Sequence, residues 1–150
     1  MTLALESRSP EDTRRRGEAL GRVAQAGDVI LLSGELGAGK TVFVQGIARG
    51  LGFDGPVSSK SFVLMGEYAA RLTLYHADLY RLDSPDEVAD LALEEISREG
   101  VLVVEWPERG DAVLPEERLT LRFEVTGETA RRITAEATGE RAQALLEALR

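Results

Sequence analysis

Apolar residues follow two different periods along this chain, and each period predicts one kind of element. Unbroken apolar runs at 29–32 and 101–104 are typical of strands that are buried on both faces of a parallel sheet. From Leu119 to Val125 every second residue is apolar, and residues 133–135 repeat this alternation. These two segments predict half-buried antiparallel strands at one side of the sheet.

Capping signals followed by apolar residues at helical spacing predict helices. Ser9 and Pro10 begin the first helix, because a serine side chain caps the first turn and proline fits within it. This helix is expected to end at Gly27. We expect its inward face to consist of Ala19, Leu20, Val23 and Ala24.

Three more elements complete the predicted order. Two β-like runs at 62–68 and 72–77 are close enough in sequence to form a hairpin. A second capping signature begins a helix over about 84–93, and an amphipathic helix at 142–149 closes the chain.

The segment after the first apolar run has the pattern G-x-x-x-x-G-K-[ST] of a phosphate-binding loop. Its glycines allow successive backbone N–H groups to turn towards a phosphate chain, and the following helix adds its positive end. We predict that Lys40 contacts the terminal phosphates and that the Thr41 hydroxyl binds Mg²⁺. The nucleotide-binding residues expected here are Glu35, Leu36, Gly37, Ala38, Gly39, Lys40, Thr41 and Val42.

Strand, phosphate loop and helix in this order predict a P-loop NTPase-like fold. The class is α/β, with three layers around a mixed parallel and antiparallel central sheet. We expect residues 1–150 to form a single domain, because 150 residues with 43% hydrophobic composition suffice for one core.

Two acidic residues follow predicted strands at the positions where a magnesium-bound triphosphate needs carboxylates. Asp78 follows the run 72–77, and Glu105 follows 101–104. We predict Lys40, Asp78 and Glu105 as catalytic residues, and Thr41, Asp78 and Glu105 as metal ligands. The alternatives are a surface acid at the strand end for Glu105 and a turn-initiating aspartate for Asp78.

The only tryptophan and the only histidine lie beside these acids. Trp106 directly follows Glu105, and its place over a nucleotide, at a partner surface or in the core stays open. His76 precedes Asp78 by two residues, and we expect a hydrogen-bonded structural role for it.

Composition narrows the classes of partner. A net charge of −8 disfavours direct binding to DNA or RNA, and the cluster Arg14-Arg15-Arg16 is more typical of a solvated helix face than of a phosphate contact. The absence of cysteine excludes disulfides and thiolate metal sites. No apolar run could cross a membrane, and no targeting signal opens the chain, so we expect a cytoplasmic protein. The absence of asparagine excludes the guanine-reading Asn-Lys-x-Asp element, which favours ATP and ADP.

Four segments, in this order and spacing, resemble the TsaE family of bacterial tRNA threonylcarbamoyladenosine biosynthesis. They are the phosphate loop at 34–41, VSSKSF at 57–62, HADLYRL at 76–82 and VVEWPE at 103–108. The resemblance covers about residues 10–125. One departure is Lys60, which stands where the family usually has proline between two hydroxyl residues.

The resemblance implies a magnesium-dependent ATPase that is weak alone and docks with TsaB and TsaD, reaching tRNA through that complex. It implies the phosphate and metal roles given above for Lys40, Thr41, Asp78 and Glu105. It also places Ser59 and Ser61 in a switch-like loop near the γ-phosphate.

Two other functions remain open from the sequence. Many small-molecule kinases use the same phosphate loop, but they need an acceptor pocket and usually an arginine-bearing lid. A nucleotide-ordered adaptor would bind ATP without hydrolysing it.

Overall fold

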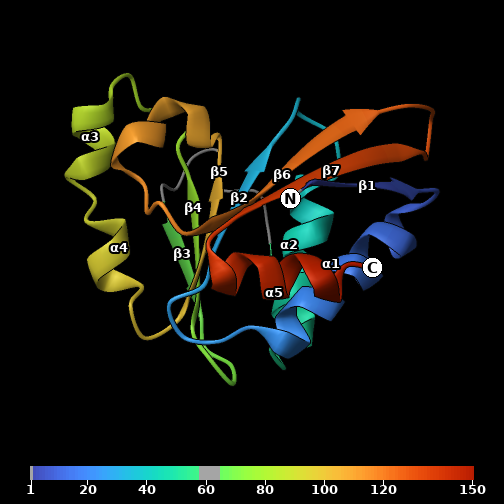
Figure 1. Cartoon of the computed structure of the whole chain (residues 1–150), viewed down its shortest axis with the longest axis horizontal. Coiled ribbons are helices and arrows are strands. Elements are labelled where there is room, and N and C mark those ends of the chain that lie inside the picture. Colours follow the sequence, from blue (N-terminus) through green and yellow to red (C-terminus); the bar gives the residue numbers. More distant parts are fainter. Residues whose placement is uncertain (1, 58–64) are drawn as a thin grey trace.

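A mixed β-sheet forms the centre of the molecule (Figure 1). The structure is a computed structural model, and it describes residues 2–57 and 65–150. The strands found there are β1 (Thr2–Ser7), β2 (Val29–Ser33), β3 (Met65–Tyr68), β4 (Leu74–Asp78), β5 (Val101–Glu105), β6 (Arg118–Val125) and β7 (Arg131–Thr138). Within the described residues they form one sheet in the order β1-β7-β6-β2-β5-β4-β3. Strands β6, β2, β5 and β4 are parallel, while β7 and β3 run antiparallel to their neighbours.

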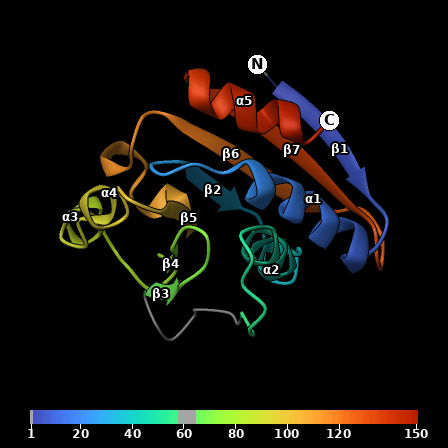
Figure 2. The same cartoon turned by 90° about the horizontal axis from the view of Figure 1, so that it is seen from below.

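Helices cover both faces of this sheet. They are α1 (Pro10–Val23), α2 (Lys40–Gly50), α3 (Pro85–Ala89), α4 (Leu93–Ile96) and α5 (Glu140–Ala148), with short 3₁₀ turns at Pro107–Arg109 and Asp111–Val113. Figure 2 shows α1 and α2 on one side and α3 and α4 on the other. Along β2, Ile30 and Leu32 pack with α1, α2 and α5, whereas Val29 and Leu31 pack with α3 and α4. The predicted α/β fold with a mixed sheet is confirmed.

The predicted helix starts at Ser9 and Ser84 are confirmed, but both of these helices were predicted too long. Helix α1 ends at Val23, four residues before Gly27. The Ser9 and Ser84 side chains accept hydrogen bonds from backbone N–H groups three residues later, at 3.1 and 3.3 Å. The helix expected over 84–93 is instead two short helices, α3 and α4, with Ala92 between them in the left-handed region (φ 51°). Val88 and Leu93 are both buried, and five residues on one helix would separate them by about 140°. The break allows both side chains to enter the same core.

Helix α1 packs against α2 through glycines, and this corrects its predicted inward face. A Cβ on Gly17 would lie 2.3 Å from the carbonyl oxygen of Phe43, and one on Gly46 would lie 2.1 Å from that of Arg14. Leu20 and Ala24 are buried as predicted, but Val23, on the far side from the glycines, is 43% exposed. The close backbone contact fixes α2, and with it the end of the phosphate loop, against α1.

The strand predictions differ from the structure mainly at the edges of the sheet. The hairpin of β3 and β4 and the antiparallel pair β6 and β7 are confirmed. The first three residues of the predicted run 62–68 lie outside the described part of the chain, and the remaining four, Met65–Tyr68, form β3. Strand β1 was not predicted, because it is a short edge strand that depends on pairing with β7. None of the described helices is long and apolar enough to cross a membrane.

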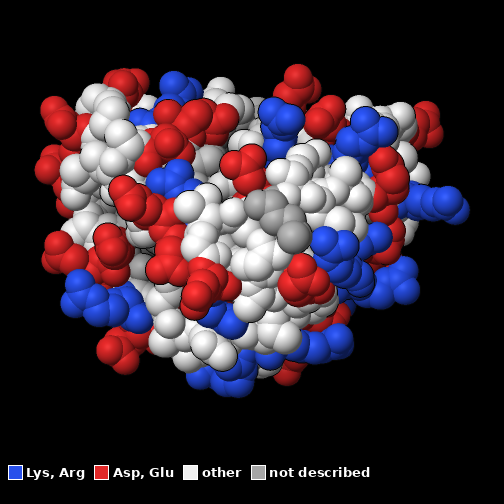
Figure 3. All heavy atoms as spheres, viewed as in Figure 1, with Lys and Arg blue, Asp and Glu red and all other residues white. Residues whose placement is uncertain are grey.

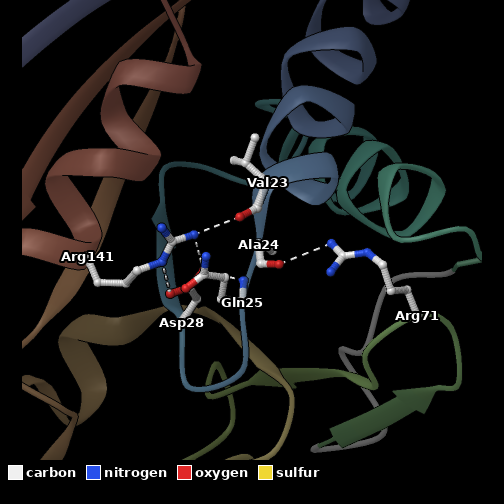
Figure 4. A network of polar contacts seen from close by, with 6 residues as sticks. All are labelled: Val23, Ala24, Gln25, Asp28, Arg71 and Arg141. Atoms are coloured by element: carbon white, nitrogen blue, oxygen red, sulfur yellow. Dashed lines mark hydrogen bonds and ion pairs between the residues drawn. The ribbon is translucent and has the colours of Figure 1, made fainter.

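A polar network fixes the end of the sheet opposite the phosphate loop (Figure 4). Asp28, just before β2, is buried and accepts hydrogen bonds from the Arg141 guanidinium and from the backbone N–H of Gln25. Arg71, from the turn between β3 and β4, donates to the carbonyl oxygen of Ala24 beyond the end of α1. The network therefore ties the C-terminal helix and the hairpin to α1.

Candidate functional site

A cavity of about 310 Å³ opens where the phosphate loop meets the carboxyl ends of β4 and β5. It is lined by Leu36, Gly37, Gly39, Lys40, Thr41, Val42, Asp78 and Glu105, all of which belong to the predicted site. Glu35 and Ala38 line a neighbouring cavity beside Phe123 instead. Ser59 and Ser61 lie outside the described residues. The fold therefore brings the loop and both predicted acids together, while their roles stay predictions.

The loop backbone at this cavity adopts conformations that favour glycine. Gly37 and Gly39 have φ values of 80° and 102°, in the left-handed region where a side chain is strained. Gly39 directly precedes the first residue of α2. The first backbone N–H groups of a helix have no intrahelical acceptor, so those of Lys40, Thr41 and Val42 are available to an anion.

Lys40 is buried at the bottom of this site. Its side chain is only 4% exposed, and its Nζ donates a 2.6 Å hydrogen bond to the carbonyl oxygen of Gly34. The ammonium also lies 4.3 Å from the centre of the Trp106 ring. Burial lowers the pKa of Lys40, and nearby carboxylates, led by that of Glu105, oppose this shift. The Lys40 ammonium is thus poorly hydrated and lies near the carboxylates of Glu105, Asp78 and Glu108.

Asp78 takes part in a local turn and also lines the cavity. Its Oδ1 accepts a 2.9 Å hydrogen bond from the backbone N–H of Tyr80, as the turn alternative required. Burial raises the pKa of Asp78, and the charge of Glu105 adds to this, whereas the Tyr80 N–H, His76 and Lys40 lower it. The turn contact and a role in the cavity are therefore compatible.

Glu105 is paired with the only histidine of the chain. Glu105 Oε2 lies 2.6 Å from His76 Nε2, and both side chains are buried. The expectation that His76 is hydrogen-bonded is confirmed, but its partner is a predicted catalytic acid. No local pattern indicates this partner, because the two residues belong to different strands.

Trp106 turns the chain sharply after Glu105. It has φ 57°, an uncommon value for a residue with a side chain. Its ring centre lies 4.9 Å from that of Tyr80, and its indole packs partly against the core shared with α3 and α4. Trp106 thus contacts the core on one side and the Lys40 ammonium on the other.

One further contact at the loop was missed from the sequence. Arg131, at the start of β7, donates a 3.2 Å hydrogen bond to the carbonyl oxygen of Gly37. The two residues are far apart in the sequence, and no local motif marks an arginine in that position. Only the topology, which places the β6–β7 turn beside the phosphate loop, reveals it.

Comparison with known proteins agrees with this geometry. A family model described as "Threonylcarbamoyl adenosine biosynthesis protein TsaE" matches residues 7–133. The chain belongs to the TsaE family. It is 44% identical over 129 residues to the tRNA threonylcarbamoyladenosine biosynthesis protein TsaE of Treponema pallidum. The aligned residues make up 85% of this chain and 96% of that protein. The TsaE of Bacillus subtilis is 41% identical over 143 residues, covering 94% and 89% of the two chains.

A solved TsaE-like structure has the same architecture. The crystal structure of YdiB from Bacillus subtilis superposes with a TM-score of 0.80 at 36% identity, covering 99% of this chain and 94% of that one. The resemblance to the TsaE family drawn from four short segments is confirmed over most of the chain.

Proposed function

We propose that this TsaE protein binds ATP with Mg²⁺ in the cavity at the phosphate loop and hydrolyses it during tRNA threonylcarbamoyladenosine biosynthesis. The observation that supports this most directly is the shared lining of that cavity, which combines Lys40 and the loop backbone with Asp78 and Glu105. The names of the relatives supply the pathway.

The donor set of the cavity suits Mg²⁺. Thr41 offers a hydroxyl, and Asp78 and Glu105 offer carboxylates, which are the oxygen ligands that this ion takes beside phosphate and water. When bound, the ion would neutralise charge on the phosphate oxygens.

The chain's own groups would act by position and charge. Lys40 and the first N–H groups of α2 would hold the phosphates, and the Lys40 ammonium would act more strongly because its side chain is shielded from water. Glu105 would orient a water that attacks the γ-phosphorus in line with the departing oxygen of ADP. It would also accept a proton from that water. The Lys40 ammonium gives one of its three N–H donors to the carbonyl oxygen of Gly34, which leaves two donors for phosphate oxygens.

We further propose that this protein acts in a complex with TsaD- and TsaB-type proteins. By itself it would hydrolyse ATP slowly. The charge distribution supports an indirect contact with tRNA. On the face in Figure 3, acidic side chains gather over α3 and α4, and arginines lie among acids at the opposite edge. A net charge of −8 also disfavours unaided binding to a polyanion.

Substitution of Glu105 by glutamine tests the proposal. In the presence of the partner proteins, Glu105→Gln should reduce phosphate release by about 10²-fold or more, while labelled ATP still binds. Parallel assays of the wild-type protein provide the reference. If the wild-type complex assembled on ATP but released no phosphate, the protein would be a nucleotide-ordered adaptor.

A further inference from the structure

Among the described residues at the site, His76 is the buried polar group for which the proposed ATPase has no use. It lies on β4, two residues before Asp78, and is fully buried. Strands β4 and β5 are parallel and pair His76 with Val103 and Asp78 with Glu105. Because side chains alternate along a strand, all four point to the same face of the sheet. This face carries α2 and Lys40, so the imidazole lies directly behind the cavity wall.

The contact with Glu105 fixes where the imidazole carries its proton. An ionised carboxylate only accepts hydrogen bonds, so the 2.6 Å contact requires a proton on Nε2. Nδ1 is buried and has no hydrogen-bond partner among the described residues. The geometry therefore favours a ring that donates its Nε2–H to Glu105.

This hydrogen bond also keeps Glu105 away from Lys40. The two charges attract each other, yet the ammonium donates to the Gly34 carbonyl oxygen, and the described residues show no ion pair between it and Glu105. Without the imidazole, the Glu105 carboxylate would lose a hydrogen-bond donor while remaining buried. The carboxylate would then rotate towards Lys40 and pair with its ammonium. In that position it would block the place of a phosphate group.

We propose that His76 is a positioning residue, which holds one oxygen of Glu105 so that the other stays directed at the water-binding side of the cavity. This inference rests on the proposed function, because Glu105 must act in hydrolysis for its orientation to matter. Partners that orient reactive groups from behind typically contribute about 10- to 100-fold to activity.

Two substitutions of His76 separate positioning from packing. His76→Leu removes the donor, and we expect kcat for ATP hydrolysis to fall about 10- to 100-fold while KM for ATP changes less than about threefold. His76→Gln retains an N–H donor at a reach similar to that of Nε2, and it should recover most of the lost kcat. In a Glu105→Gln background, His76→Leu should cause little further loss, because both changes remove one function.

Ser97→Ala is a matched control for loss of a buried hydrogen bond. The Ser97 hydroxyl donates at 2.6 Å to the carbonyl oxygen of Leu93, away from the cavity. This variant should lower the melting temperature and leave kcat unchanged. If His76→Leu behaved in the same way, His76 would be merely structural.

A spectroscopic measurement tests the contact without any activity. The chain has one histidine, so protein labelled with ¹⁵N-histidine gives one set of imidazole signals. We expect wild-type protein to show a proton on Nε2, the nitrogen that faces Glu105, and Glu105→Gln to shift the Nε2–H signal. A proton found on Nδ1 alone, or a His76→Leu variant with wild-type kcat, would overturn the positioning role only. A wild-type complex that releases no phosphate would overturn the proposed function itself.

Discussion

Two buried aspartates lie at opposite ends of the parallel sheet, and the protein treats their charges differently. Asp28, before β2, is 3% exposed, and Asp78, at the end of β4, is 4% exposed. The carboxylate of Asp28 accepts two hydrogen bonds from Arg141 and one from Gln25, at 2.8 to 3.1 Å (Figure 4). Asp78 accepts one from Tyr80, and the described residues form no salt bridge with it.

This difference is the one we expect if Asp28 is a structural charge and Asp78 a charge that binds a ligand. A buried carboxylate is stable when a cation and hydrogen-bond donors satisfy it, as at Asp28. Burial without such a partner raises the pKa of Asp78, so its ionised form costs folding free energy. Incomplete pairing of this kind is typical of functional sites, because the ligand supplies the missing charge.

The largest effect should come from removing the cation at each end of the sheet. Lys40→Ala should lower ATP turnover by about 10²-fold or more, by loss of a preorganised positive charge. Arg141→Ala should leave turnover unchanged and reduce thermal stability, because Arg141 contacts Asp28 and the end of α1, at the end of the sheet opposite the cavity. Phosphate release and melting curves on both variants check this pair. Equal ATP turnover in the two variants would show that the two ends of the sheet do not differ in function.

Removing the carboxylate of Asp28 should have the next largest effect. Asp28→Ala removes the carboxylate acceptor of Arg141 and of the Gln25 backbone N–H, while Arg141 keeps its bond to the carbonyl oxygen of Val23, and we expect the free energy of unfolding to fall by about 2 kcal/mol. The value is at the low end for a buried pair, because the Arg141 side chain is one-third exposed (32%). Urea unfolding measures it. A loss below about 0.5 kcal/mol would show that the network contributes little to stability.

A smaller effect of opposite sign is expected at Asp78. The raised pKa means that the folded protein binds this proton more tightly than the unfolded chain does. The stability from Asp78 is therefore fully present below its ordinary pKa of 3.8 and is lost as the pH rises through the folded value. Asp78→Asn keeps an acceptor for Tyr80 and removes the charge, so its melting temperature should exceed that of the wild type at pH 7, by on the order of 1 °C.

The pH dependence provides the control for that substitution. The advantage of Asp78→Asn should shrink as the pH falls towards 4, since the wild-type carboxyl becomes neutral as well. An advantage that did not change with pH would point to packing rather than to charge.

The sequence predicted the cavity end of the molecule better than the opposite end, and the reason is physical. The phosphate loop and the acids at strand ends depend on local motifs and on the general geometry of parallel sheets. The Asp28–Arg141 pair joins residues 113 positions apart, so no local pattern reveals it. The contact between His76 and Glu105 likewise depends on the register of β4 with β5, which the sequence does not define. The break at Ala92 was missed because it depends on the tertiary burial of Val88 and Leu93, for which no local pattern gives a signal.

Calorimetric titration of ATP, with and without Mg²⁺, tests most directly whether Asp78 and the phosphate loop form a site for a magnesium-bound nucleotide. The account predicts that wild-type protein binds ATP more tightly with Mg²⁺, and that Asp78→Asn loses most of this gain while Asp28→Ala, at a temperature where it is folded, keeps it. Absence of binding to the wild-type protein, also in the presence of its partners, or an unchanged Mg²⁺ gain in Asp78→Asn, would contradict it.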